Sequence, residues 1–349
     1  RPHQRDQGLP GPPERVAGGP PALWCYSARV GRRLDSRRAT EAEARSTGSF
    51  ARCGAPGAPT GPGTCQAAPS TRMRMDPTEL YIDLLKKTLE FDLWDEPGMP
   101  VTLLPARRPG HKLLHGLSHG LQRLGYQVTK LPRADRSKRE AGATWPTLAH
   151  SMIGSRRLDN IRDCVQTVIR EDIPGDFIET GVWRGGAVIL MKGILKACGS
   201  VDRRVFAADS FQGLPPPDQG KYPADAGDDH HRFRDYLGVS RQQVEESFRR
   251  YGLLDDKVVF LEGWFKDTLA SAPIERLAIL RLDGDMFEST HDALQALYPK
   301  LQPGGFCIVD DYSHPACRQA VDDYFRAHDT RPSPTRIDWS GAFWRKPFA

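Results

Sequence analysis

Two short apolar segments that end in carboxylates constrain the fold of this chain more than any other feature. Residues 277–285 read LAILRLDGD, and residues 306–312 read FCIVDDY. Apolar runs with β-branched residues are typical of buried parallel strands, which present the side chains that follow them at the carboxyl edge of an α/β sheet. Neighbouring strands of this kind end roughly 5 Å apart. Asp283, Asp310 and Asp311 are therefore candidates to share one hard cation through oxygen ligands.

The rest of the chain supplies the elements that such a sheet needs. From residue 158 on, helical periodicity alternates with short apolar runs. Strands are predicted at residues 176–179, 204–209, 257–261, 277–282 and 306–309. Helices are predicted at residues 158–169, 187–198, 240–254, 289–301 and 315–328, and a terminal hairpin at residues 337–344. Because strands and helices alternate, we expect an α/β fold with a doubly wound, mostly parallel sheet and its functional site at the carboxyl edge.

The first 75 residues differ in composition from the remainder. Residues 1–75 contain 10 Gly, 10 Pro, 12 Arg, no Lys and 5 acidic residues, a charge of +7, whereas the other 37 basic and 39 acidic residues give −2. We expect a disordered, low-complexity tail, and natural translation that starts at Met73 or Met75. The rival hypothesis is a basic arm that binds nucleic acid. The charge of the remainder does not support a uniformly basic nucleic-acid-binding face.

Residues 76–150 are predicted to contain a helix followed by a weakly patterned segment. Asp76 and Pro77 resemble an N-cap and a first helical position. Leucines then recur at helical spacing, at Leu80, Leu84, Leu85 and Leu89. Residues 94–145 contain dispersed Gly, Pro, Arg and His, and we interpret them as a mobile segment that forms a lid or an interface.

Membrane insertion and disulfide bonding are not indicated by the sequence. The chain has no apolar run of the length that spans a bilayer and no charged-then-apolar signal pattern at its start. We therefore expect a cytoplasmic protein without a membrane partner. The seven cysteines include no C-x-x-C pair, which favours free thiols.

Candidate ligand-binding residues follow the first three predicted strands. Residues 179–186 read ETGVWRGG, a turn that lacks the spacing of dinucleotide and P-loop sites and that, taken alone, also fits an ordinary tight turn. Asp209 ends the second strand, where an acid can accept hydrogen bonds from the ribose of an adenosine-type ligand; alternatively, Asp209 and Ser210 cap a turn. Trp264 follows the third strand and could stack beside an adenine or fill the core.

The sequence DGD suggests two roles for its aspartates. Asp283 and Asp285 flank Gly284, so in an extended segment both side chains point the same way. One could then bind a cation while the other faces a bound substrate. The alternative is a solvated loop with an acidic helix N-cap.

The remaining polar candidates are histidines and one long loop. Four histidines lack zinc-type spacing and are interpreted as surface or loop residues: His230, His231, His291 and His314. Of these, His314 follows Asp311 closely enough to be an alternative base. Residues 211–236 form a longer loop than a compact domain needs, and we expect it to cover the site.

Taken in order, the motifs closely resemble those of one known family. The segments HSMIGSRRLDNI, GDFIETGVWRGG, ADSFQGLP, YPADAGD, EGWFKDTL, LRLDGDMFEST and GGFCIVDDY are similar to the macrocin O-methyltransferase family. The resemblance runs from about residue 76 to the C-terminus and is dense from Trp145 on. It implies a Rossmann-like class I methyltransferase domain at residues 151–349, an N-terminal helical lid at residues 76–150, and the cofactors S-adenosylmethionine (S-adenosyl-L-methionine) and Mg2+.

The resemblance also implies roles for individual residues. The Mg2+ ligands would be Asp283, Asp310 and Asp311, with Asp285 as general base. The amino-acid end of the cofactor would be lined by Glu179, Thr180, Gly181, Val182 and Trp183. The ribose would lie at Asp209 and Ser210, and the adenine between Gly263 and Trp264. The residues that close over the cofactor would be Ser151 and Met152.

The activity implied by the resemblance is Mg2+-dependent methylation of a sugar hydroxyl on a macrolide or aminocoumarin antibiotic. Mg2+ would hold two neighbouring hydroxyls and lower the pKa of one, and Asp285 would accept its proton. The alternatives are methylation of a catechol or another vicinal diol, and S-adenosylmethionine binding without turnover. The expected partner is a small glycosylated natural product and not nucleic acid. The oligomeric state is left open, a homo-oligomer included.

Overall fold

The computed structural model describes residues 76–104, 109–131, 135–330 and 332–348. The predicted tail at residues 1–75 lies outside the described residues. Residues Thr71–Ala349 make up one compact unit of the chain, and the elements discussed below belong to it. None of the helices that the structure describes combines the length and apolarity needed to cross a membrane.

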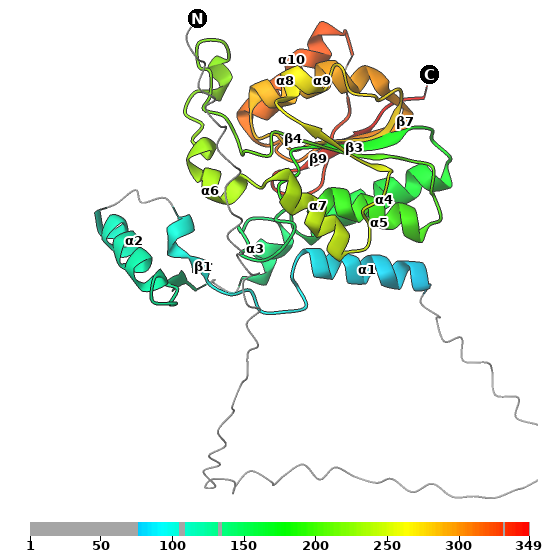
Figure 1. The fold of residues 1–349 in the computed structure, drawn as a ribbon. Coiled ribbons are helices and arrows are strands. Elements are labelled where there is room, and N and C mark those ends of the chain that lie inside the picture. The colour runs from blue at the N-terminus through cyan, green and yellow to red at the C-terminus, as the bar shows by residue number, and fades with distance from the viewer. Residues whose placement is uncertain (1–75, 105–108, 132–134, 331, 349) are drawn as a thin grey trace, which may run out of the picture. The chain divides into compact units, whose positions relative to one another are not determined.

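A seven-stranded sheet with the order β5-β4-β3-β6-β7-β9-β8 forms the centre of this unit (Figure 1). Its strands are β3 (Asp176–Thr180), β4 (Val205–Asp209), β5 (Val258–Glu262), β6 (Leu277–Leu282), β7 (Leu301–Val309), β8 (Thr335–Arg336) and β9 (Ala342–Arg345). The first five of these strands are parallel, and β9 runs antiparallel to both β7 and β8. The predicted doubly wound, mostly parallel sheet is confirmed, and the terminal hairpin is present with slightly shifted strands.

Helices cover both faces of the sheet (Figure 1). One face carries α1 (Pro77–Leu89), α4 (Ser155–Arg170), α5 (Gly186–Ala197) and α7 (Arg241–Arg250). The other carries α8 (Phe265–Thr268), α9 (Phe287–Leu297) and α10 (Pro315–Ala327). Each helical layer buries its apolar side chains against the sheet in a separate core cluster. The strands between the two layers are therefore apolar on both faces, as expected for a parallel sheet.

Local sequence signals explain where several helices begin. The Asp76 carboxylate caps α1 by accepting a hydrogen bond from the Thr78 backbone N–H at 3.1 Å. The predicted capping box of Ser240 and Gln243 opens α7. The buried face of α1 is formed by Ile82, Leu85 and Leu89, whereas Leu80 and Leu84 remain about half exposed (52% and 51%).

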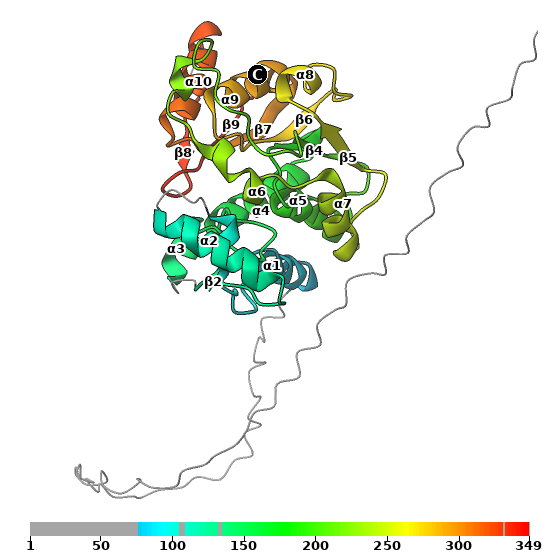
Figure 2. The ribbon, with the colours of Figure 1, turned by 60° about the vertical axis from the view of Figure 1, so that its left-hand side comes forward.

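Residues 94–145 contain more regular structure than their weak periodicity predicts. They form η1 (Val101–Leu103), α2 (Pro109–Gln122), α3 (Arg136–Glu140) and a short ladder of β1 (Met99–Pro100) with β2 (Thr129–Lys130). Figure 2 shows α2, α3 and β2 on the same side of the sheet as α4 and α5. The sequence hid α2 because Gly110, Gly116 and Gly120 interrupt its apolar pattern.

Candidate active site

A cavity of about 580 Å³ opens at the carboxyl edge of the parallel strands. Its lining includes the four aspartates after β6 and β7 and nearly every residue expected at the cofactor: Ser151, Met152, Glu179, Gly181, Val182, Trp183, Asp209, Ser210, Gly263 and Trp264. Thr180 is the exception, because its side chain is buried and its hydroxyl lies 3.5 Å from the carbonyl oxygen of Arg281. The volume is in the range of cavities that hold small-molecule ligands.

The turn after β3 brings two strand ends close together. Gly181 has a φ of +86°, and a Cβ at this position would lie 1.7 Å from the carbonyl oxygen of Asp283. Only glycine fits so close an approach. The Asp283 backbone N–H also donates to the carbonyl oxygen of Thr180 at 2.8 Å. The turn ETGVWRGG therefore places the Glu179 side and the Asp283 side of the cavity next to each other.

Asp209 fixes the backbone on both sides of the second strand end. Its two carboxylate oxygens accept hydrogen bonds from the backbone N–H groups of Val182 and Phe211, each at 2.8 Å. Burial raises the pKa of Asp209, and these backbone donors oppose the shift. Asp209 thus holds the turn after β3 against the turn after β4 while it lines the cavity. Both sequence interpretations of Asp209, turn cap and ligand-facing acid, fit this position.

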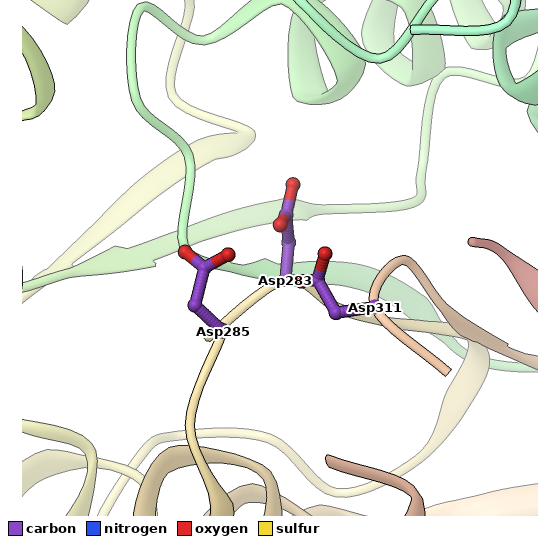
Figure 3. Close-up of side chains that lie close together, drawn as sticks. All are labelled: Asp283, Asp285 and Asp311. Carbon is purple, nitrogen blue, oxygen red and sulfur yellow. The ribbon is translucent and has the colours of Figure 1, made fainter. Parts of the chain in front are cut away.

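Three aspartates converge in the cavity. Asp283, Asp285 and Asp311 each offer a carboxylate oxygen, and these oxygens lie within 4.8 Å of one another (Figure 3). Among the described residues, Asp311 Oδ2 has no hydrogen-bond partner although the atom is buried. Asp285 adopts a left-handed backbone conformation with a φ of +58°, which is strained for a non-glycine residue. Hard oxygen donors in this arrangement fit a divalent cation such as Mg2+.

The ionisation of this cluster is costly without a cation. Burial, reinforced by repulsion from Asp310, raises the pKa of Asp283 to about 7. Burial also raises the pKa of Asp285, and it raises the pKa of Asp311 well above its usual range. The neighbouring carboxylates contribute to each shift. A bound cation would favour the ionised forms and so oppose these shifts.

Asp310 points to two arginines that sequence reasoning did not single out. Its Oδ1 accepts from Arg281 Nη2, and its Oδ2 accepts from Arg157 Nη1. Arg281 Nη1 also donates to Glu179 and, at 2.8 Å, to Asp283. The structure therefore brings Asp285, expected as the base, into the carboxylate cluster and directs Asp310, expected as a cation ligand, to guanidinium groups. The available signal was an arginine inside the otherwise apolar strand LAILRL.

The loop after β4 lines one wall of the cavity, as its length predicted. It contains η2 (Pro223–Asp225), η3 (His230–Phe233) and α6 (Arg234–Leu237). Asp225 fixes the loop to the start of α9. Its carboxylate accepts hydrogen bonds from the backbone N–H groups of Phe287 and Glu288, at 2.6 and 3.1 Å. The zinc-type spacing test missed His230, which lines the cavity. Its Nδ1 lies 2.5 Å from Asp228 Oδ2, and this contact raises the pKa of His230 to about 9.

Aromatic side chains hold the segment that carries Ser151 and Met152. Trp145 stacks on Tyr236 with ring centroids 5.1 Å apart, and Trp183 Nε1 donates to the carbonyl oxygen of Tyr236 at 3.0 Å. Arg184 donates to the carbonyl oxygens of residues 147 and 149, both at 2.9 Å. The start of the HSMIG motif is thereby held against the turn after β3. This contact explains why two residues far from the sheet in sequence line the same cavity.

The fold and the cavity define a class I S-adenosylmethionine-dependent methyltransferase. The solved structure of the O-methyltransferase NovP matches this chain with a TM-score of 0.67 and 43% sequence identity, covering 78% of this chain and 100% of that chain. The family described as macrocin-O-methyltransferase (TylF) matches residues 78–346. The chain belongs to the macrocin O-methyltransferase family, and it is a methyltransferase.

Two curated relatives illustrate the range of the family. Mycinamicin III 3''-O-methyltransferase of Micromonospora griseorubida is 50% identical over 270 residues, 77% of this chain and 96% of the relative. The 8-demethyl-8-(2,3-dimethoxy-alpha-L-rhamnosyl)-tetracenomycin-C 4'-O-methyltransferase of Streptomyces olivaceus is 44% identical over 273 residues, 78% of this chain and 95% of the relative. The two names give different positions of methylation.

Proposed function

We propose that this protein transfers the methyl group of S-adenosylmethionine to a sugar hydroxyl of a glycosylated natural product, with Mg2+ held at the ends of β6 and β7. The convergence of Asp283, Asp285 and Asp311 in the cavity carries this proposal. When bound, S-adenosylmethionine supplies the methyl group, and Mg2+ supplies Lewis acidity at the substrate oxygens. The protein supplies position, charge compensation and exclusion of water.

We assign the cation to Asp283 and Asp311 and the general base to Asp285. Asp285 has no arginine partner among the described residues, unlike Asp283, so no guanidinium group competes with a proton for its carboxylate. Burial raises the pKa of Asp285, and a raised carboxylate pKa suits a base that works near neutral pH. Both oxygens of Asp310 accept from guanidinium groups, so we assign Asp310 to positioning.

The cofactor residues proposed from the family motifs also fit the cavity chemically. Glu179 Oε2 is a buried carboxylate oxygen without a hydrogen-bond partner in the described part of the chain, which suits the ammonium group of the cofactor. Asp209 and Ser210 would face the ribose, and Trp264, which is partly exposed, would cover the adenine. Residues 76–150 and the loop after β4 would close the site against water.

The substrate does not need two free neighbouring hydroxyl groups. In the name of the tetracenomycin relative, positions 2 and 3 of the rhamnose carry methoxy groups, and position 4' is methylated. The oxygen next to that hydroxyl is therefore already methylated. A cation at Asp283 and Asp311 would need a neighbouring oxygen atom and not a second free hydroxyl. We propose a sugar hydroxyl with such a neighbour, in a macrolide or a related glycoside, as the substrate class.

The two rival functions differ from this proposal in what they require. A catechol presents two adjacent oxygens as well, but the rhamnosyl group in the name of the tetracenomycin relative favours a sugar. A binding protein without turnover has no need of three converging carboxylates beside its cofactor. No observation favours either rival over the sugar O-methyltransferase.

The test is a methyl-transfer assay with purified protein, S-adenosylmethionine and mycinamicin III or related glycosides, with Mg2+ or with a chelator. Mass spectrometry would follow the methylated product together with S-adenosylhomocysteine. We expect product only with Mg2+. Equal turnover in the chelator would contradict the cation assignment. Failure of the folded protein to bind S-adenosylhomocysteine would contradict the cofactor assignment.

A further inference from the structure

Arg281 is the least expected residue of strand β6. The strand reads LAILRL, and all six of its residues are buried. The Arg281 side chain is 0% exposed, in the middle of the sheet between β3 and β7. A guanidinium group is costly to bury, and replacing a buried ion pair with apolar residues is often neutral or stabilising. Stability alone therefore does not explain an arginine at this position.

The guanidinium group of Arg281 connects the ends of three neighbouring strands. Nη1 donates to Glu179, at the end of β3, and to Asp283, which follows β6, the second bond being 2.8 Å long. Nη2 donates to Asp310, which follows β7. Glu179 lies on the side of the cavity proposed for the cofactor, and Asp283 belongs to the carboxylate cluster proposed for the cation. One nitrogen atom, Nη1, thus contacts both halves of the site.

Arg157 provides a natural comparison within the same network. It comes from α4, is also buried, and donates to Asp310 and to Asp338. No ion pair between Arg157 and Glu179 or Asp283 occurs among the described residues. The two arginines share Asp310, but only Arg281 reaches the cofactor side. A comparison of variants at Arg281 and Arg157 therefore distinguishes two roles. One is a link between the two halves of the site, and the other is general support of the buried carboxylates.

We propose that Arg281 is a positioning residue that couples the cofactor half of the site to the cation half. It holds Glu179 and Asp283 in fixed geometry through a planar, forked group that lysine cannot replace. With a cation bound at Asp283, that carboxylate would hold Nη1 less strongly, and Nη1 would be left to orient Glu179. This inference rests on the proposed function, because it requires both ligands.

The test measures ligand binding by the full-length protein and not only activity. S-adenosylhomocysteine binding is followed by calorimetry, and Mn2+ binding by electron paramagnetic resonance, because Mn2+ takes the same oxygen ligands as Mg2+. We expect Arg281→Lys, which keeps the positive charge, to lower the affinity for each of the two ligands at least tenfold. We expect Arg157→Lys, which changes a guanidinium group that has no ion pair with Glu179 among the described residues, to weaken S-adenosylhomocysteine binding at most a third as much as Arg281→Lys does. A merely structural role would lower the thermal midpoint while the folded protein kept both affinities.

Two results would overturn the proposal. One is an Arg281→Lys protein that is folded and keeps either affinity within twofold of wild type. The other needs no variant, and so applies even if Arg281→Lys fails to fold. In the wild type, S-adenosylhomocysteine should bind at least threefold more tightly with Mn2+ than with a chelator, since the coupling is reciprocal. Equal affinities would overturn the link, whereas a wild type that binds neither ligand would overturn the proposed function itself.

Discussion

Asp310 and Asp311 are adjacent in sequence but lie in opposite electrostatic environments. Asp310 is buried, and both of its oxygens accept hydrogen bonds from guanidinium groups. Asp311 lies in the carboxylate cluster with Asp283 and Asp285, and its Oδ2 has no partner among the described residues. The carboxyl edge thus contains an arginine-compensated group, Glu179 and Asp310, and an open group, Asp285 and Asp311. Asp283 belongs to both, because it contacts Arg281 and the cluster.

The difference shows how a protein can keep acidic residues available in its interior. A buried carboxylate such as Asp310, whose two oxygens both accept from guanidinium groups, fixes geometry but has little charge left for a ligand. Glu179 differs, because Arg281 donates to its Oε1 whereas its Oε2 has no partner among the described residues. A carboxylate without such a partner is unfavourable in the empty site and becomes favourable when a cation arrives. We infer that Asp310 orders the site, that the second oxygen of Glu179 stays available to the cofactor, and that the open group, together with Asp283, binds the cation and reacts.

The largest expected effect is the loss of cation binding when the open group is changed. Asp311→Asn should lower the Mn2+ affinity at least about 100-fold, because even residues that only support metal ligands contribute 10–100-fold. S-adenosylhomocysteine binding should remain. Paramagnetic resonance and calorimetry on the same preparation measure the two affinities. Mn2+ binding close to that of wild type would remove Asp311 from the cation site.

Asp285→Asn is the matched control within the open group. It should lower kcat by about 10²–10⁴, the usual contribution of a general base, and change the Mn2+ affinity much less than Asp311→Asn does. Steady-state kinetics with a saturating glycoside would separate kcat from KM. If Asp285→Asn lost cation binding as severely as Asp311→Asn, Asp285 would be a ligand and the base would have to be another group.

A change in the compensated group should act mainly on stability. Asp310→Asn leaves two buried guanidinium groups without their shared partner, which should cost about 3–5 kcal/mol of unfolding free energy. Urea denaturation monitored by tryptophan fluorescence would measure this. Asp323→Asn is the surface control, because its partner Arg326 is 75% exposed and such a pair should contribute less than about 1 kcal/mol. A similar small effect for Asp310→Asn would contradict the assignment of Asp310 to positioning.

Much of the fold follows from local sequence signals, and the deviations have local causes. Strand β7 begins at Leu301, where Leu301 pairs with Leu277, five residues before its predicted start. The prediction placed the start too late because Pro303, Gly304 and Gly305 resemble a turn. Helix α9 ends at Leu297, four residues before its predicted end at residue 301. The reason is Pro299, after which the chain continues as the 3-10 helix η4 (Tyr298–Lys300). The order and the type of the predicted elements of the sheet and its helices are nevertheless those of the structure.

The site was only partly predictable, because pairing between distant residues leaves no local pattern. Strand ends that stop at acids identified Asp283, Asp310 and Asp311 as a cluster near one edge. Which of these acids is compensated depends on Arg157, which lies 153 positions before Asp310. The position of His230 at the cavity depends on a loop held by Asp225 to the start of α9, and no spacing rule contains that contact. Sequence therefore predicted which strand ends line the cavity but not how the charges of its acidic side chains are divided.

The smallest expected effect concerns His230, a titratable side chain near the open group. The hydrogen bond to Asp228 raises the pKa of His230 to about 9, and the Asp285 carboxylate reinforces the shift. Because the folded pKa exceeds the unfolded value, the stability from this pair is complete below about pH 6.5 and is lost as the pH rises through about 9. Asp228→Asn should move the His230 midpoint, followed by NMR, toward 6.5. His150 is the internal reference, because burial lowers its pKa to about 4 and it should stay neutral throughout. A wild-type midpoint for His230 below pH 7 would contradict this prediction, because His230 would then be neutral beside the open group at neutral pH. The open group would in that case have even less positive charge near it than the arginine-compensated group has.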